Sequence, residues 1–283
     1  MTAPILRSLK VLRALTTQWH RDDETIGVVP TMGALHAGHL SLVETAKKEC
    51  DQVVVTIFVN PTQFNNPEDL DRYPRTEAED ANILEPYGIG AIYVPEAKEI
   101  YPDGFSTTVS VAGLADMMEG PGRPGHFEGV ATVVAKLFLQ TQADKAYFGE
   151  KDYQQLLVVR RMARDLDIPV QVIGCETVRE PSGLALSSRN ARLSTAGIEV
   201  ASKKYQVMQH VSEGLRTGQA MDSLVEQAQS VLLDEGFTEI EYMELRCAET
   251  LELLTHAERP ARLFVAAWVE GVRLIDNIPV LPA

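Results

Sequence analysis

The sequence has few cysteines, and it lacks both a long hydrophobic run and a signal-peptide pattern. Its 283 residues contain only Cys50, Cys175 and Cys247, and these lack the paired spacing of zinc-binding motifs. Scattered cysteines of this kind favour a reducing compartment, so we expect a cytoplasmic protein. Because no apolar run is long enough to cross a bilayer, we expect no membrane partner.

Positive charge is also scarce. Lysine and arginine together number 26 against 40 aspartates and glutamates, which gives a formal net charge of −14. A field of this sign repels polyanions, so we expect no nucleic-acid partner, although a small nucleotide can still bind in a locally positive pocket. With 45% hydrophobic and 23% charged residues, the composition is that of a globular protein of one large or two moderate domains.

Strand and helix patterns alternate through the first part of the sequence. Nearly continuous apolar runs, such as residues 53–59, are typical of strands buried on both faces of a parallel sheet. We therefore expect an α/β fold with a Rossmann-like, doubly wound parallel sheet. Thr76 and Glu79 form a predicted capping box at one helix start. Strands are expected at residues 26–29, 53–59, 88–95, 107–111, 144–148 and 170–175, and helices at 4–19, 40–50, 76–87, 130–142 and 156–166.

The rest of the sequence has a different character. We place the domains at residues 1–177 and 178–283, and we expect the second to be a smaller α+β domain. It has few candidate catalytic groups, so its expected role is to cover the site of the first domain. Helices are expected at residues 194–215 and 221–235, and strands at 240–246, 261–268 and 272–275.

The segment from Gly27 to Leu42 organises the first domain. Its apolar run ends at Pro30, which cannot continue the ladder of a central strand. His36 and His39 follow, separated by three positions, with Gly38 leaving room for a ligand. Free backbone N–H groups and the helix dipole attract phosphate at such a helix start, and this is the interpretation that we favour. The alternatives are helix capping and a metal site, but zinc-hydrolase helices have His at i and i+4 with an adjacent Glu.

Other polar candidates occur at strand ends and in loops. Asn60 and Gln63 follow a buried strand, where parallel sheets bind ligands, and turn capping is the alternative for both. Arg123 and His126 lie in a glycine- and proline-rich loop and could face a substrate or cap the loop. Lys151 stands at a helix N-terminus against the dipole preference, which is reasonable if an anion shares the site.

The loop Leu186–Asn190 combines two serines, an arginine and an asparagine. These side chains can donate several hydrogen bonds to phosphate oxygens, and an arginine can do so bidentately. The alternative is a flexible loop between the two domains. Together with the His-x-Gly-His turn, the loop favours binding of a phosphate-bearing ligand.

These motifs extend into five blocks, which are Pro30–His39, Phe58–Phe64, Arg123–Phe127, Phe148–Gln155 and Leu186–Asn190. Together and in this order they resemble the pantothenate synthetase (pantoate–β-alanine ligase) family. The His-x-Gly-His turn alone marks only the wider superfamily of nucleotidyltransferases and class I aminoacyl-tRNA synthetases. One departure lies in the last block, where related synthetases carry a lysine-containing K-M-S-K-S-type segment and Arg189 retains the charge here.

The resemblance implies a two-step reaction. ATP adenylates the carboxylate of (R)-pantoate with the help of Mg²⁺ and releases pyrophosphate, and the amine of β-alanine then attacks the acyl adenylate to give pantothenate and AMP. The family assigns the second histidine, His39, as proton donor, and His36 and Lys151 can stabilise the phosphates. The resemblance also implies a homodimer.

The resemblance also assigns the binding residues. Gln63 and Gln155 would hold pantoate, and Gln63 would also serve β-alanine, since amide side chains suit hydroxyl groups. Asn60 would support nucleotide binding. The Mg²⁺ ligands stay open between the acidic stretch 68–80 and the ATP phosphates themselves. The implied ATP-binding residues are Met32, Gly33, Ala34, Leu35, His36, Ala37, Gly38, His39, Gly149, Glu150, Lys151, Asp152, Val178, Leu186, Ser187, Ser188 and Arg189.

Three rival functions share much of this apparatus. A nucleotidyltransferase of the same fold would leave the nucleotide on its product, and the glutamine pair and the second domain favour the ligase over it. A nucleotide-sensing module would bind without turnover. Ligation to tRNA is disfavoured by the acidic charge and by the lack of a basic anticodon-binding module.

Overall fold

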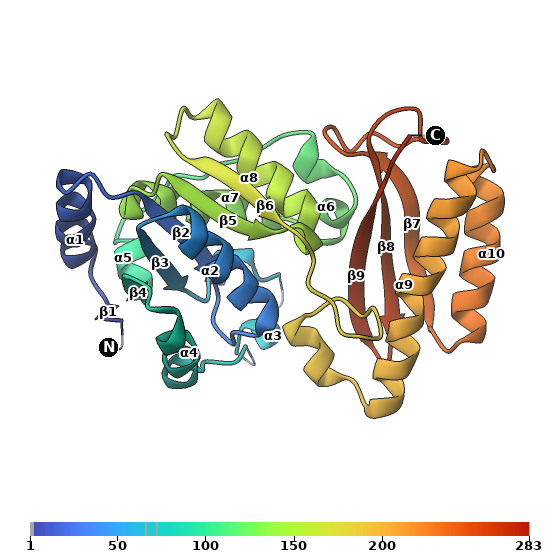
Figure 1. The fold of residues 1–283 in the computed structure, drawn as a ribbon, viewed down its shortest axis with the longest axis horizontal. Coiled ribbons are helices and arrows are strands. Elements are labelled where there is room, and N and C mark those ends of the chain that lie inside the picture. The colour runs from blue at the N-terminus through green and yellow to red at the C-terminus, as the bar shows by residue number, and fades with distance from the viewer. Residues whose placement is uncertain (1–2, 66, 72, 283) are drawn as a thin grey trace. The chain divides into compact units, whose positions relative to one another are not determined.

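The structure is a computed structural model that describes residues 3–65, 67–71 and 73–282. The chain forms two compact units (Figure 1). The first contains the described residues up to Glu150 together with Gln154–Glu176. The second contains Lys151–Tyr153 and the described residues from Thr177 onward. The three residues Lys151–Tyr153 therefore pack with the second unit although their neighbours in the chain belong to the first.

The first unit contains a six-stranded, entirely parallel sheet in the order β1-β4-β3-β2-β5-β6. This confirms the predicted α/β fold with a doubly wound parallel sheet. Its elements are β1 (Ile5–Leu6), α1 (Leu9–Arg21), β2 (Ile26–Thr31), α2 (Ala37–Glu49), β3 (Gln52–Ile57), η1 (Pro61–Gln63), α3 (Pro67–Asp71), α4 (Glu77–Leu84), η2 (Glu85–Tyr87), β4 (Ala91–Tyr93), α5 (Ala97–Ile100), η3 (Leu114–Asp116), α6 (Glu119–Gly122), α7 (His126–Thr141), β5 (Lys145–Gly149), α8 (Tyr153–Asp165) and β6 (Gln171–Cys175), with η4 (Glu150–Asp152) between β5 and α8.

The central strands are buried on both faces, as their apolar runs predict. Val53, Val54 and Val55 of β3 are all fully buried. Val53 and Val55 face the cluster that contains Leu42 and Val43 of α2, and Val54 faces the opposite side because strand side chains alternate. Figure 1 shows α2 in front of the sheet and α7 behind it.

Pro30 lies inside β2, where the sequence predicted the strand to have ended. It pairs in register with Thr56 of β3, and β2 continues to Thr31. On its other side, β2 pairs with β5 only at Gly27 and Val28. Pro30 lies beyond this pairing, so the N–H that proline lacks is not needed for a hydrogen bond to β5. The expectation that proline ends this strand is therefore wrong by two residues.

Several other local predictions also differ from the structure. Pro4 does not begin a helix, because Ile5–Leu6 pairs with β4 as an edge strand and α1 starts after its N-cap Ser8. Residues 107–111 form no strand. The predicted loop from Asn60 contains the short helix η1, and its Asn66 lies outside the described residues.

The second unit is a small α+β domain, as predicted. Its three-stranded antiparallel sheet has the order β7-β8-β9, and α9 and α10 pack against each other and against this sheet (Figure 1). Apolar residues of both helices and all three strands form one core, with Met208, Leu232 and Leu263 fully buried. The elements are η5 (Ser188–Arg192), α9 (Thr195–Arg216), α10 (Met221–Asp234), β7 (Glu239–Cys247), β8 (Ala261–Val269) and β9 (Val272–Val280).

Candidate functional site

The turn between β2 and α2 is held by a buried carboxylate. Gly33 and Ala34 both have positive φ angles, +83° and +50°. Asp80 of α4, which is 1% exposed, accepts the backbone N–H of Ala34 at 3.0 Å and that of Leu35 at 2.8 Å. A Cβ at position 33 would lie 3.0 Å from the Asp80 carboxylate, so glycine lets the turn approach its support. The strained turn is thus fixed by hydrogen bonds to a distant helix.

Thr76 takes part in the same support. The structure corrects the predicted capping box, because the Thr76 side chain makes no capping bond to α4. Its hydroxyl instead accepts the N–H of Ala34 and donates to Asp80, both at 3.1 Å. The hydroxyl therefore joins α4 to the turn.

Groups of the turn itself accept further backbone N–H donors. Besides Ala34 and Leu35, Gly33 donates to the Thr31 hydroxyl at 3.1 Å. The N–H of His36 donates to Nδ1 of His39 at 3.3 Å, and the N–H of Gly38 donates to Nδ1 of His36 at 3.1 Å. These five N–H groups are therefore bound within the protein, and contact of this turn with phosphate stays a prediction. Side chains and the helix dipole remain to recognise an anion here.

His36 and His39 cap α2 reciprocally, so the capping alternative is correct as far as Nδ1 is concerned. Their ring centroids lie 4.1 Å apart, with 40° between the planes. An Nδ1 that accepts a backbone N–H carries no proton, so each neutral ring carries its proton on Nε2. Capping thus fixes the tautomer as well as the helix start, and it leaves Nε2–H as the donor of each neutral ring.

Asn60 supports the loop after β3. It is 1% exposed, and its Oδ1 accepts the backbone N–H of Thr62 at 3.4 Å and the Tyr101 hydroxyl at 2.8 Å. Its Nδ2 donates to the Gly129 carbonyl and to Oε1 of Gln63, each at 3.1 Å. Of the two alternatives for Asn60, the structure supports turn capping, since its amide is fully engaged with the protein.

Gln63 is held between that loop and the central turn. Its Nε2 lies 3.0 Å from the Met32 sulfur, and its carbonyl is 2.9 Å from Nδ1 of His126. His126 is buried at the start of α7 and donates to this carbonyl, which favours the loop-supporting alternative over substrate contact. Two predicted residues from separate loops, Met32 and Gln63, are thus neighbours.

Gly129 brings α7 against the loop that carries Gln63. A Cβ at position 129 would lie 2.6 Å from the Thr62 carbonyl oxygen and 2.8 Å from the Gln63 nitrogen. Only glycine allows this approach of helix to backbone. Gly129 therefore positions Gln63 without contacting its side chain.

A second glutamine pair begins α8. Gln154 is 2% exposed and supports the preceding loop, accepting the N–H of Glu119 and donating to the carbonyls of Leu114 and Met117. Its neighbour Gln155 is half-buried, and no hydrogen bond of its side chain occurs within the described part of the chain. Gln155 is therefore the member of the pair that is available to a ligand. Arg123, the other candidate in this region, pairs with Glu119 at 3.2 Å.

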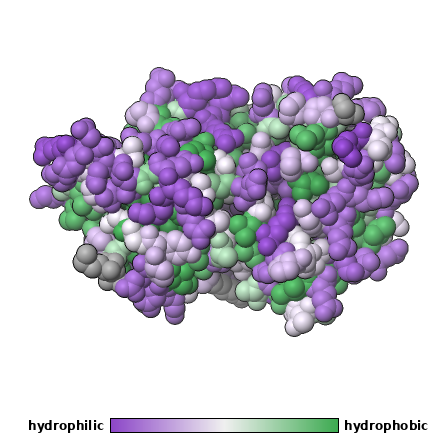
Figure 2. Space-filling view, in the orientation of Figure 1, coloured by the Kyte–Doolittle hydropathy of each residue, from purple (hydrophilic) through white to green (hydrophobic). Residues whose placement is uncertain are grey.

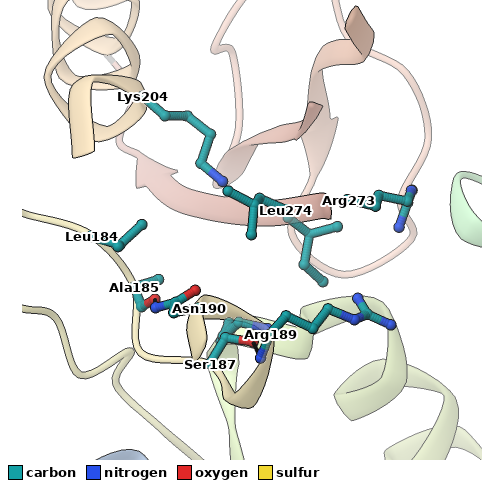
Figure 3. A pocket seen from close by; sticks show the side chains of 10 residues that line it. Leu184, Ala185, Ser187, Arg189, Asn190, Lys204, Arg273 and Leu274 are labelled. Atoms are coloured by element: carbon teal, nitrogen blue, oxygen red, sulfur yellow. Dashed lines mark hydrogen bonds between the residues drawn. The ribbon is translucent and has the colours of Figure 1, made fainter. Parts of the chain in front are cut away.

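The second unit contains a positively charged pocket (Figure 3). It encloses about 270 Å³, counting its open mouth, and four of its ten lining residues are cationic, whereas none is acidic. Lys151 enters from the segment between β5 and α8, and Arg189 from η5, where Ser187 caps the helix by accepting the N–H of Arg189. Leu186 borders the same loop and donates its N–H to the Val178 carbonyl at 2.9 Å. The lining residues are Lys151, Leu184, Ala185, Ser187, Arg189, Asn190, Lys204, Arg273, Leu274 and Ile275.

The segment that carries Lys151 is anchored firmly in the second unit. The Lys151 carbonyl accepts the side-chain amide of Asn277 at 2.9 Å. Tyr153 donates its hydroxyl to the Ala248 carbonyl at 3.1 Å, and the Arg262 guanidinium stacks 4.2 Å from its ring centroid. The Lys151 side chain is 18% exposed, and its ammonium lies 3.3 Å from the carboxylate of the more exposed Asp152.

The structure thus brings the predicted residues together in two groups. In the first unit, Met32–His39 forms the central turn and Gln63 lies beside it. In the second unit, Lys151, Ser187 and Arg189 line one pocket. Gly149 ends β5 and Glu150 begins η4 in the first unit, and Ser188 opens η5 in the second.

The sequence analysis missed several supporting residues, namely Asp80, Gly129, Gln154 and Lys204. Only Lys204 left a signal, because it stands on the apolar face of α9 between Ala201 and Met208. The other three are recognised only by contacts with residues distant in the sequence.

The described residues offer no protein metal centre. No group of three or more His, Cys, Asp or Glu side chains is arranged to hold a metal ion among them. Within the acidic stretch 68–80, Asp80 uses both oxygens for the turn, and Arg72 lies outside the described residues. The alternative of a histidine metal site at His36 and His39 therefore has no support.

None of the helices in the described ranges is both long and apolar enough to span a membrane. Figure 2 shows hydrophilic side chains over most of the visible face, with hydrophobic ones scattered among them.

The three cysteines are buried free thiols, and burial raises the pKa of Cys50 and Cys175.

Comparison with known proteins agrees with the motifs. The family model described as pantoate-beta-alanine ligase matches residues 4–279. Proteins named pantothenate synthetase from Ruegeria sp. (strain TM1040) and Ruegeria pomeroyi are 65% and 64% identical over 280 residues, covering 99% of this chain and 100% and 98% of theirs.

Solved structures give the same result. The pantothenate synthetase of Thermus thermophilus is 45% identical with a TM-score of 0.92, covering 99% of this chain and 100% of that one. The pantoate-beta-alanine ligase of Francisella tularensis, solved with beta-gamma ATP and beta-alanine, is 38% identical with a TM-score of 0.82, covering 98% of this chain and 97% of that one.

Proposed function

The chain belongs to the pantoate–β-alanine ligase family, and from this membership we propose that residues of the β2–α2 turn and residues of the cationic pocket bind ATP for the ligation. The enzyme condenses (R)-pantoate with β-alanine in an ATP-dependent reaction that passes through pantoyl adenylate. Two anions must meet in the first step, the pantoate carboxylate and the triphosphate. The site must therefore neutralise charge and orient both reactants.

His36 and His39 act on the phosphates in this proposal. Their capping bonds fix both rings, so the Nε2–H groups are preorganised donors for phosphate oxygens and need no reorientation during the reaction. As the carboxylate oxygen attacks the α-phosphorus, negative charge grows on the departing pyrophosphate. A hydrogen bond from the Nε2–H of His39 to that leaving group stabilises the growing charge and lowers the barrier. The two neighbouring rings, each with an Nδ1 that caps α2, are the observation that carries this assignment.

The second unit supplies positive charge to the same nucleotide. We propose that Lys151, Ser187, Ser188 and Arg189 bind its phosphates, with Arg189 able to bind two oxygens at once. The pocket that Lys151, Ser187 and Arg189 line contains no acidic side chain among the described residues, which supports an anionic ligand. The other proposed ATP-binding positions are Met32–Gly38, Gly149, Glu150, Asp152, Val178 and Leu186.

Gln63 and Gln155 are the proposed pantoate ligands. The amide of Gln63 is held beside the central turn, and that of Gln155 is available at the start of α8. Each amide can donate to and accept from the hydroxyl groups of pantoate. In this proposal Gln63 also binds β-alanine. The amine of β-alanine attacks the acyl carbon in the second step and releases AMP.

Mg²⁺ would be carried by the ATP phosphates, since the described residues provide no three-ligand set for it. We also propose a homodimer, on the strength of the resemblance, and a cytoplasmic location, which the three buried free thiols support. Sedimentation of the purified protein tests the dimer directly.

Product analysis tests the function. We expect AMP to be released only when ATP, pantoate and β-alanine are all present. With pantoate and ATP alone, labelled pyrophosphate should exchange into ATP, because the first step is reversible and needs no amine. Incorporation of the nucleotide into a stable product would instead identify a nucleotidyltransferase, and binding without either reaction would identify a nucleotide-sensing module.

A further inference from the structure

Lys204 is a buried cation inside the second unit. It lies on α9, is 1% exposed, and its side chain extends into the pocket toward β9 (Figure 3). Within the described part of the chain, its ammonium has no hydrogen bond and no ion pair. The neighbouring Lys203, in contrast, is exposed and lies 3.8 Å from Glu235.

Lys204 lies on the apolar face of α9, where a charged side chain is unfavourable. Lys204 shares the buried face of α9 with Ala201, Met208 and Val211, which pack in the apolar core. An apolar side chain is the favourable choice on such a face, because a buried ammonium loses its hydration. A lysine at this position calls for a compensating anion.

The protein itself supplies little compensation. Asp276 of β9 is the acidic group that acts on Lys204, but Arg179 binds its two oxygens at 2.7 and 2.8 Å. The other charges around Lys204 are positive: Arg273 from β9, Lys151 from the segment between β5 and α8, and Arg179 again. Burial, the largest cause, and these cations together lower the pKa of Lys204 to about 8, although Asp276 acts in the opposite direction.

A second cation of the pocket also lacks a counter-charge. Arg189 has no ion pair among the described residues, whereas Arg273 pairs with Glu241 at 2.7 Å. Figure 3 shows Arg189 and Arg273 extending toward the same side of the pocket. The pocket is thus lined by two cations, Lys204 and Arg189, that have no ion pair among the described residues.

We propose that Lys204 is a further phosphate-binding residue of this ligase, whose ammonium binds the diphosphate portion of ATP and the pyrophosphate released from it. This inference rests on the proposed function of the pocket. A diphosphate carries several negative charges and compensates Lys204 and Arg189 together. A buried ammonium is costly without an anion beside it, so pairing it with the diphosphate adds to the free energy of binding.

Calorimetric titration of the full-length protein with inorganic pyrophosphate tests the proposal, with Lys204→Met, Lys204→Arg and Lys203→Met as variants. At pH 7 we expect Lys204→Met to bind pyrophosphate at least tenfold more weakly than wild type. Lys204→Arg should recover part of this loss, and Lys203→Met should bind within twofold of wild type. The thermal midpoint of ligand-free Lys204→Met should equal or exceed that of wild type, since a buried charge has been replaced by an apolar chain.

A pH series separates a charge effect from a packing effect. The affinity ratio of wild type to Lys204→Met should fall toward 1 between pH 7 and pH 9, because the wild-type ammonium loses its proton in that range. Equal pyrophosphate affinity of the two proteins at pH 7, or a ratio that does not change with pH, would overturn the role of Lys204. Failure of the wild type to make pantothenate would instead overturn the proposed function, so the two failures are distinct.

Discussion

Asp80 accepts the backbone N–H of Leu35 at 2.8 Å, across 45 positions of sequence. With the neighbouring N–H of Ala34 bound to the same carboxylate, this contact holds the central turn in a conformation that L-residues rarely adopt. The histidine pair follows directly in the chain, so the geometry of the proposed site depends on a residue that no motif contains.

Asp80→Asn should therefore damage the enzyme although Asp80 contacts no substrate in the proposed mechanism. The amide NH₂ would face a backbone N–H that needs an acceptor, and we expect a loss of about 1–3 kcal/mol in the free energy of unfolding. Turnover should fall at least tenfold. Glu79→Gln, an exposed position on the same helix, is the matched control and should change neither quantity. Urea denaturation and AMP release measure them, and wild-type turnover in Asp80→Asn would show that the turn does not depend on this carboxylate.

Gly129→Ala tests the positioning of Gln63. The new methyl group would lie 2.6 Å from the Thr62 carbonyl oxygen, so the loop must shift, at a cost of about 1–3 kcal/mol. We expect KM for pantoate and β-alanine to rise more than KM for ATP. Gly122→Ala, where a Cβ meets nothing within 4 Å, is the control. Equal changes in all three KM values would contradict the proposed link between Gly129 and Gln63.

The two roles of His39 can be separated by two substitutions. His39→Ala removes both the cap and the ring, and we expect ATP binding to survive largely while adenylate formation drops by about two orders of magnitude or more. His39→Gln restores an acceptor suited to a capping box but supplies no imidazole. Its thermal midpoint should return toward that of wild type while its pyrophosphate exchange stays low. If pyrophosphate exchange recovers in His39→Gln, the role of His39 is to cap the helix and the imidazole is not needed for adenylation.

Gln155→Ala should affect pantoate more than ATP. The side chain has no protein partner within the described residues, so its removal should leave the thermal midpoint unchanged. We expect KM for pantoate to rise at least tenfold and KM for ATP to change little, as for Gln63→Ala. Steady-state kinetics with each substrate varied in turn decides the matter, and parallel increases in both values would tell against the assignment.

Lys204 should make the stability of the ligand-free enzyme depend on pH. Burial lowers its pKa from 10.5 to about 8, so between these values the unfolded chain binds more protons than the native state. Stability contributed at this site therefore rises from about pH 8 to pH 10.5, by an amount of about 3 kcal/mol. The difference in unfolding free energy between wild type and Lys204→Met isolates the effect. If this difference in unfolding free energy stays constant from about pH 8 to pH 10.5, the pKa of Lys204 is not lowered by the fold, and the prediction is wrong.

Local sequence patterns predicted the parts of the fold that short stretches determine. The apolar run of β3 and the alternation of strands with helices led to the doubly wound sheet, because burial on both faces requires such runs. Failures occurred where a distant partner decides the outcome. Ile5–Leu6 is a strand because β4 lies beside it, and Pro30 stays in β2 because β5 makes no pair there.

The same division holds for the site. The sequence by itself determined the family and the residues that carry its chemistry, because the five blocks are contiguous and each keeps its own spacing. Only the tertiary structure decided what those residues bind to. It brought Asp80 to the central turn, Gly129 to the loop that carries Gln63, and Lys204 to the pocket that Arg189 lines. Hydrogen bonds, steric contacts and burial depend on distances in space, and local sequence patterns do not specify the distances between segments that are far apart in the chain.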